Sequence, residues 1–101
     1  MTIRILDAAA QDLIDGFRFY EVQEAGLGQY FLDSLFADID SLLLNAGIHP
    51  VCFGTYHRLL AKRFPFAIYY KVDGEQVSVY AIFDCRRNPA WNRKRLGKSE
   101  G

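Results

Sequence analysis

A β-hairpin is the strongest local signal in this chain. Two runs rich in aromatic and β-branched residues, 66–72 and 76–83, flank an Asp-Gly dipeptide at 73–74. Asp tolerates and Gly favours the positive φ angles of a tight primed turn, so the two runs are predicted to pair antiparallel. The second run leads directly into the segment Asp-Cys-Arg-Arg at 84–87. The hairpin is therefore predicted to form the centre of a small sheet, with two arginines where its second strand ends.

Helical periodicity accounts for most of the first half of the chain. Apolar residues recur at helical spacing from Ala8 to the glycines at 26 and 28, and again over residues 29–46. A break this short joins antiparallel helices, so a helical hairpin is predicted. Apolar residues 2–6 and the segment 57–63 are predicted strands. The order β-α-α-β-β-β indicates an α+β fold, in which the helical hairpin packs on a small, mainly antiparallel twisted sheet.

The same periodicity assigns inner and outer faces to the two predicted helices. Gly16 is a poor helix former, so its place inside a helix predicts close packing against a neighbour. Residues 51–56 are predicted to be an irregular crossing segment. The predicted core positions are Ala10, Leu13, Ile14, Phe17, Leu32, Leu35, Phe36, Ile39, Leu42, Leu43 and Ala46, and the predicted outer positions include Asp12, Asp15, Asp33, Asp38 and Asp40.

Length and charge indicate one domain with a polarised surface. A chain of 101 residues, half of them hydrophobic, can bury a single core. We expect that domain to span residues 1–91 and a basic C-terminal tail to span residues 92–101. Residues 1–50 carry eight acidic and two basic side chains, a net charge of −6, and residues 51–101 carry four acidic and ten basic ones, a net charge of +6. This asymmetry indicates a charged partner, or else an acidic helical face and a solvated basic tail.

The sequence offers no pattern for a cofactor. The two cysteines, Cys52 and Cys85, share no metal-ligand spacing with each other or with His49 and His57, so no metal site is expected. No phosphate-binding glycine loop and no serine in a nucleophile-elbow motif occur. No apolar run reaches membrane-spanning length and no secretory signal is apparent, so we expect reduced, buried thiols in a cytoplasmic protein without a membrane partner.

Three positions near the predicted strands are candidates for site residues. His57 at the start of a strand has two interpretations, a general base near a phosphodiester or, more commonly, a histidine with a structural hydrogen bond. Arg86 and Arg87 are neighbours at the end of a strand, so their side chains are predicted to point to opposite faces. One is expected to pair internally with Asp84 or with an acid of the first helix, which leaves the other free for phosphate or carboxylate oxygens.

The predicted tail combines an aromatic residue with basic ones. It contains Trp91, Arg93, Lys94 and Arg95. Basic side chains beside an aromatic ring suit a nucleic-acid surface. Alternatively, Trp91 folds back on the core and the bases remain solvated.

Two motifs resemble a known family. The segment Arg-Phe-Pro-Phe-Ala-Ile-Tyr-Tyr-Lys-Val at 63–72, followed by the Asp-Gly turn and by Arg-Arg-Asn-Pro at 86–89, is similar to the RelE/ParE superfamily of bacterial type II toxins. The resemblance extends from Ile3 to about Trp91 and includes the β-α-α-β-β-β order. It implies that fold, and it implies a cognate antitoxin that lays a helix over the helical hairpin and adds a strand to the sheet edge.

The resemblance also separates two branches of the superfamily. RelE-like toxins cleave messenger RNA in the ribosomal A site and use an arginine at the position of Ala67, which can neither stabilise a phosphorane nor move a proton. Arg87 matches a second arginine of these toxins, Arg58 and Lys62 keep positive charge on the preceding strand, and Arg93 falls near the place of a C-terminal aromatic residue. The ribonuclease set is therefore incomplete, which favours the ParE-like branch.

ParE-like toxins inhibit DNA gyrase without catalysing a reaction. The resemblance thus implies a gyrase inhibitor, not an enzyme, whose target contacts are Arg86, Arg87, Trp91, Arg93, Lys94 and Arg95. One alternative is a RelE-like ribonuclease acting on ribosome-bound messenger RNA with an atypical site formed by His57, Arg58 and Arg87. Another is a degenerate member that binds its antitoxin and has no toxic activity.

Overall fold

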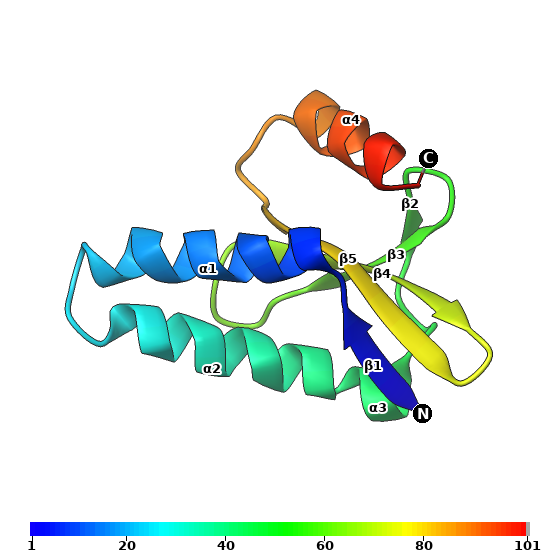
Figure 1. Ribbon diagram of the computed structural model, residues 1–101, viewed down its shortest axis with the longest axis horizontal. Helices are drawn as coiled ribbons and strands as arrows, with labels where there is room; N and C mark the ends of the chain where they lie inside the picture. Colours follow the sequence, from blue (N-terminus) through cyan, green and yellow to red (C-terminus); the bar gives the residue numbers. More distant parts are fainter. Residues whose placement is uncertain (101) are drawn as a thin grey trace.

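The computed structural model describes residues 1–100 and has the predicted α+β architecture (Figure 1). Five strands form one sheet in the order β1-β5-β4-β3-β2, in which β1 runs parallel to β5 and the other neighbours are antiparallel. The predicted β-α-α-β-β-β order is confirmed, and two short elements, α3 and β2, and a C-terminal helix, α4, accompany it. The elements are β1 (Thr2–Ile5), α1 (Asp7–Glu21), α2 (Leu27–Asp40), α3 (Leu42–Asn45), β2 (Val51–Cys52), β3 (Tyr56–Leu60), β4 (Phe66–Asp73), β5 (Gln76–Asp84) and α4 (Pro89–Glu100).

The predicted hairpin is the centre of the sheet. Strands β4 and β5 pair from Phe66 opposite Asp84 to Asp73 opposite Gln76, so the turn consists of Gly74 and Glu75. Gly74 has a φ of 61°, the left-handed conformation that glycine adopts without steric cost. The register shifts once, because Tyr69 pairs with Ala81 and Tyr70 with Val79, which leaves Tyr80 as the extra residue of a β-bulge.

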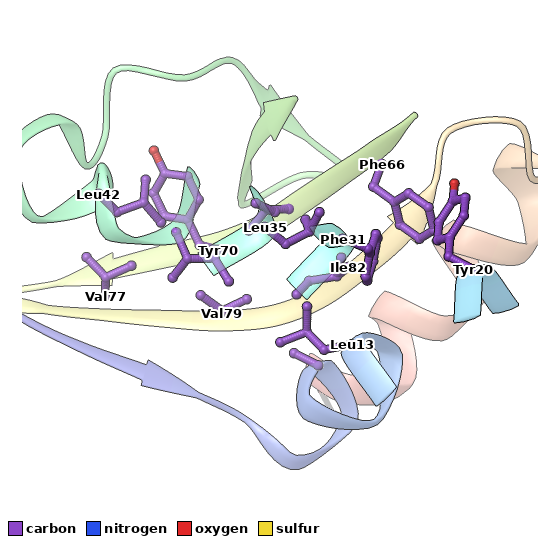
Figure 2. Close-up of a cluster of buried hydrophobic side chains, with 13 residues drawn as sticks. Leu13, Tyr20, Phe31, Leu35, Leu42, Phe66, Tyr70, Val77, Val79 and Ile82 are labelled. Carbon is purple, nitrogen blue, oxygen red and sulfur yellow. The ribbon is translucent and has the colours of Figure 1, made fainter. Parts of the chain in front are cut away.

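The larger hydrophobic core lies between the helical hairpin and one face of the sheet. Figure 1 shows α1 and α2 running antiparallel, as predicted. The ring of Phe31 meets that of Phe66 edge to face at 5.0 Å. An added Cβ at Gly16 would lie 2.5 Å from the Phe31 ring, so the glycine permits the close helix packing that its position predicted. Figure 2 shows the cluster, which includes Leu13, Tyr20, Phe31, Leu35, Leu42, Phe66, Tyr70, Val77, Val79 and Ile82.

The buried faces of the two helices are rotated from the predicted ones. Ile14 and Phe36, predicted core residues, are 43% and 41% exposed. Asp38, predicted to lie outside, is buried, and its Oδ2 accepts a hydrogen bond of 3.1 Å from the backbone N–H of Lys62. The prediction for these residues was wrong because the helices are apolar over more than one face, so periodicity alone does not select the face that the sheet covers.

Helix α4 covers the opposite face of the sheet. Leu96 is fully buried in a second cluster with Tyr56, Ala67, Tyr69, Ala81 and Phe83. The Tyr56 hydroxyl donates to the carbonyl oxygen of Leu96 at 3.0 Å, which ties β3 to the helix. Residues 92–100 of the predicted basic tail therefore belong to a helix that packs on the sheet, and Gly101, the last residue of that predicted tail, lies outside the described residues.

Two further expectations differ from the structure. Residues 51–52 form the short edge strand β2, where an irregular segment was predicted. Both cysteines are free thiols, but Cys85 is exposed, not buried. In the described part of the chain no helix has the length and apolar character to cross a bilayer, and no three His, Cys, Asp or Glu side chains gather as metal ligands would.

Candidate functional site

A cleft of about 340 Å³ opens where α1, the end of β5 and α4 meet. Its size lies in the range of ligand sites. Both charged and aromatic side chains line it. They belong to Asp12, Asp15, Phe19, Phe66, Phe83, Asp84, Arg87, Trp91 and Arg95, with Gly16 and Ile82 completing the wall.

Asp12 joins the three elements that form this cleft. Its Oδ1 and Oδ2 each lie 2.9 Å from a guanidinium nitrogen of Arg95, so α1 and α4 share a bidentate ion pair. Asp12 Oδ2 also accepts a hydrogen bond of 3.0 Å from the backbone N–H of Ile82 on β5. Strand β1 ends at Ile5, opposite Val79, so it does not extend as far as Ile82 on β5. The Asp12 carboxylate accepts the hydrogen bond from the Ile82 N–H there. Asp12, predicted to be an outer residue, is a structural clamp.

Burial raises the pKa of Asp12 above its ordinary value of 3.8. The hydrogen bonds from Arg95 and Ile82 act in the opposite direction, because they stabilise the ionised form. Arg95 also donates to the carbonyl oxygen of Ala8 at 3.1 Å. Arg95, one of the six predicted target contacts, thus engages α1 through its guanidinium, and its first role is to hold α4 in place.

The two adjacent arginines have different environments. Arg86 pairs with Asp84 through Nε and Nη2, at 2.9 and 2.7 Å. This hydrogen-bonded arginine holds the pKa of Asp84 below its ordinary 3.8. Arg87 instead places its guanidinium carbon 4.0 Å from the centre of the Trp91 ring. One arginine therefore has the internal ion pair that was expected, and the other faces the cleft.

The arginines lie in a turn, since β5 ends at Asp84. Asn88 then starts α4: its side-chain oxygen accepts a hydrogen bond of 2.8 Å from the N–H of Ala90, and its carbonyl oxygen accepts one from Trp91. Asn at the N-cap and Pro at the first helical position are a known helix-start pattern. The Asn-Pro pair at 88–89 was the sequence signal for α4, and hence for the cleft.

The structure separates the residues of the ribonuclease alternative. The His57 ring stacks on Tyr70 at 5.1 Å, and its Nδ1 lies 2.9 Å from the carbonyl oxygen of His49, on the side of the helical hairpin. Arg58 pairs with Tyr69 in the sheet and contacts its hydroxyl on the opposite face. Neither residue lines the cleft that contains Arg87. His57 therefore does not lie with Arg58 and Arg87 in one site, as the ribonuclease alternative requires.

The remaining candidates occupy the outer part of α4. The Arg93 guanidinium lies 5.8 Å from the centre of the Phe53 ring, and Lys94 is exposed. Ala67 is buried in the second cluster, beneath α4. The helix therefore divides the basic residues between an internal contact, Arg95, and an outer surface.

An apolar groove lies along the helical hairpin. It has a volume of about 500 Å³ and shares no residue with the cleft. Half-exposed side chains predicted to be in the core form part of its wall. The lining residues are Ile5, Ala10, Leu13, Ile14, Phe17, Gln29, Leu32 and Phe36.

This combination of a helical hairpin, a five-stranded sheet and a C-terminal helix is a ParE-like fold. The chain is similar to a chain in the structure described as "Chromosomal ParDE TA system from P. aeruginosa", with a TM-score of 0.74, 20% identity, and coverage of 83% of this chain and 95% of that chain. At this identity the similarity establishes the fold alone, so the fold that the resemblance implied is confirmed. No family model and no curated protein matches the sequence.

Proposed function

We propose that this protein is the toxin of a bacterial type II toxin–antitoxin system, acts in the cytoplasm and is neutralised by a cognate antitoxin. The observation that carries this proposal is the ParE-like fold. The protein shares this fold, over most of its own length, with a chain of a ParDE system. The sequence motifs at 63–72 and 86–89 support the same assignment independently of the fold.

The proposed activity is inhibition of DNA gyrase by binding, without a catalysed reaction. Ala67 supplies no functional group, and it is buried beneath α4. His57 and Arg58 project from opposite faces of the sheet, so a proton donor or acceptor and a cation are not assembled around one phosphodiester. In contrast, Arg87 and Trp91 lie together at an open cleft, which suits a contact surface.

The antitoxin is proposed to lay an amphipathic helix into the groove of the helical hairpin. Ile14 and Phe36 expose apolar surface there, although each is on a helix of a well-packed core. A helix with apolar side chains at i, i+3 or i+4, and i+7 fits such a groove. The acidic half of the toxin, with its net charge of −6 over residues 1–50, favours a partner helix with basic residues at its margins.

The test is expression of the chain in a bacterial host with an inducible antitoxin gene from the same operon. We expect growth arrest, an SOS response and altered plasmid supercoiling, all reversed by the antitoxin. Primer extension on cellular messenger RNA is the parallel measurement. Cleavage within codons without an SOS response would instead assign a RelE-like ribonuclease, and normal growth would assign a member that only binds its antitoxin.

A matched pair of variants links the activity to the site. Arg87→Ala is expected to abolish growth arrest. Lys94→Ala, at a predicted contact that lies outside the cleft on the exposed side of α4, is expected to leave growth arrest intact if the cleft is the target contact. Circular dichroism and antitoxin binding should be unchanged in both. Equal toxicity of the wild type and Arg87→Ala would reject the cleft as the target contact.

A further inference from the structure

We propose that the cleft between α1, β5 and α4 recognises an acidic side chain of a protein target, next to an apolar residue of that target. Arg87 binds the carboxylate, and Phe19 and Trp91 contact the apolar residue. This inference rests on the proposed function, and it reduces the predicted six target contacts to two, Arg87 and Trp91, while adding Phe19 from α1.

Stacking on Trp91 prepares Arg87 for such a ligand. The guanidinium lies 4.0 Å from the ring centre, which restricts the rotamers of a long side chain before binding. A guanidinium covered on one face keeps its N–H groups in the plane of the fork, where they match the two oxygens of a carboxylate. Among the residues whose side chains the structure describes, no carboxylate forms an ion pair with Arg87. Arg87 is thus a partly ordered cation at an open site.

The charge of the cleft favours a single carboxylate over a nucleic acid. Two of its three aspartates are already paired, Asp12 with Arg95 and Asp84 with Arg86. The third, Asp15, accepts a hydrogen bond from Gln11 and remains exposed on α1. Three aspartates and two arginines line the cleft, and Arg86, which pairs with Asp84 from outside it, brings the sum of these charges to zero. Binding of a phosphodiester backbone requires a row of unpaired cations, because counterion release supplies most of its affinity.

The aromatic side chains around Arg87 have the composition of a protein contact. Phe19 is 51% exposed and Trp91 is 39% exposed, and both line the cleft. Such exposure of large rings leaves apolar surface in water. Trp, Phe and Arg are enriched in the centres of protein–protein interfaces, where they dominate the binding energy.

The occupant is the target and not the antitoxin. The groove assigned to the antitoxin helix is lined by Ile14, Phe17 and Phe36, whereas Phe19 from the other side of α1 lines the cleft, and the two surfaces share no residue. One helix therefore offers different faces to two proteins. The antitoxin has an apolar surface of its own, so the charged cleft is available to the protein that the toxin inhibits.

The first experiment measures the ligand chemistry. Trp91 is the single tryptophan of the chain, so its fluorescence and its indole N–H signal report on the cleft directly. The probes are two blocked tetrapeptides, acetyl-Gly-Phe-Glu-Gly-amide and its Gln counterpart, and a six-nucleotide single-stranded RNA, each added up to about 10 mM, above the Kd of about 1 mM expected for so small a ligand. We expect saturable Trp91 shifts from the Glu peptide and at least about tenfold weaker binding of the Gln peptide, the loss expected for one charge-assisted contact.

Two variants and two results decide between the ligands. Arg87→Lys keeps the charge but loses the planar guanidinium, so it should lower the affinity for the Glu peptide at least about fivefold. Arg93→Lys, on the outer side of α4, is the control and should leave this affinity unchanged. Equal binding of the Glu and Gln peptides, or no Trp91 shift with the Glu peptide, would overturn the proposal. RNA binding at Trp91 that Arg87→Lys preserves would reassign the cleft to nucleic acid.

The second experiment separates this inference from the proposed function. Purified DNA gyrase and the antitoxin are each titrated with wild type, Arg87→Lys and Phe19→Ala. We expect both variants to lose at least about tenfold in gyrase affinity, as central interface residues do, and to keep their antitoxin affinity. If the wild type inhibits gyrase and the variants do so equally well, the cleft proposal fails while the toxin assignment stands. If the wild type binds neither partner, the proposed function itself fails.

Discussion

The space around a glycine decides what a larger side chain would do at its position in this protein. Gly16 shows this most directly, because a Cβ at this position would lie 2.5 Å from the ring of Phe31. Phe31 is fully buried and packs against Tyr20 and Phe66, so the ring cannot move aside without disturbing other aromatic contacts. Gly97 is the counter-example, since nothing lies within 4 Å of its added Cβ.

The two glycines therefore predict opposite effects of one substitution. Gly16→Ala should lower the free energy of unfolding by about 1–3 kcal/mol, the usual cost of overpacking a core. Gly97→Ala, in the exposed part of α4, should raise it by as much as about 0.5–1 kcal/mol, because alanine is the better helix former. Urea denaturation followed by far-UV circular dichroism measures both. A neutral Gly16→Ala would mean that the helices separate at little cost.

Asp12 and Asp15 form a second matched pair on one helix. Asp12→Asn removes the charge that holds Arg95 and weakens the bond to the Ile82 N–H, so we expect a loss of about 1–3 kcal/mol of stability. Asp15→Asn alters an exposed hydrogen bond with Gln11 and should stay within about 0.5 kcal/mol of the wild type. Denaturation midpoints at neutral pH provide the comparison, and equal midpoints would contradict the clamp.

At the scale of elements, α4 is the part whose role differs most from the expected one. It covers the second face of the sheet through Leu96 and is tied to β3 by Tyr56 and to α1 by Asp12. Deletion of residues 93–101 would therefore uncover the core as well as remove basic side chains. A loss of toxicity in such a deletion would not identify a contact residue, which is why single substitutions at Arg87 are the sharper test.

Docking of α4 has its own prediction. Leu96→Ala should lower stability by about 2–5 kcal/mol if α4 unfolds together with the domain, because it leaves a cavity at a fully buried site. The Trp91 emission maximum should move to longer wavelength as the helix loosens. Lys94→Ala, exposed on the same helix, is the control and should change neither quantity. An unchanged emission maximum in Leu96→Ala would show that α4 stays docked without this side chain.

The helical hairpin carries the corresponding prediction for the partner. Phe36→Asp places a charge on the apolar wall of the groove, at a side chain already 41% exposed. We expect antitoxin affinity to fall by at least about 2 kcal/mol, the loss typical of a central interface residue, while the fold and the toxicity remain. Calorimetric titration of the antitoxin and growth assays measure these two outcomes. Equal antitoxin affinity of Phe36→Asp and the wild type would show that the antitoxin does not bind in this groove.

At the scale of the whole molecule, pH acts through groups on both sides of the sheet. Burial, together with the charge of His57, lowers the pKa of His49 below its ordinary 6.5. The unfolded chain therefore binds this proton more readily than the folded one. The contribution of His49 to stability is complete above pH 6.5 and is lost as the pH falls through 6.5 toward the lower folded value.

The wild type should accordingly lose stability between about pH 7 and pH 5. His49→Gln, which keeps a hydrogen-bonding side chain beside Tyr70, should remove that part of the dependence. The pKa of Asp84 lies below 3.8, so Asp84 also contributes stability that is lost as the pH falls, in a range below that of His49. The raised pKa of Asp12 has the opposite effect on stability, because the folded chain binds this proton more readily than the unfolded chain. Denaturation at a series of pH values checks the slopes, and a slope retained in His49→Gln would contradict the assignment.

The sequence by itself determined the hairpin, the helix pair and their order, because these follow from local turn chemistry and from apolar periodicity. It also identified Gly16 as a close-packing site, and it predicted an internal ion pair for one of the two arginines, with Asp84 or an acid of the first helix as the partner. It carried a signal for α4 in the Asn-Pro pair at 88–89, but the few apolar residues after it gave too weak a period to support a helix.

Only the tertiary structure decided which polar residues face inward. The helical periodicity predicts that Asp12 and Asp38 face solvent. Each instead accepts a hydrogen bond from the backbone N–H of a residue in a distant strand or loop. The β-bulge at Tyr80 and the pairing of Asp12 with Arg95 likewise join residues that no local pattern connects. Local preferences act over a few residues, whereas the cleft brings together residues up to 83 positions apart, and such contacts depend on how the layers close over the sheet.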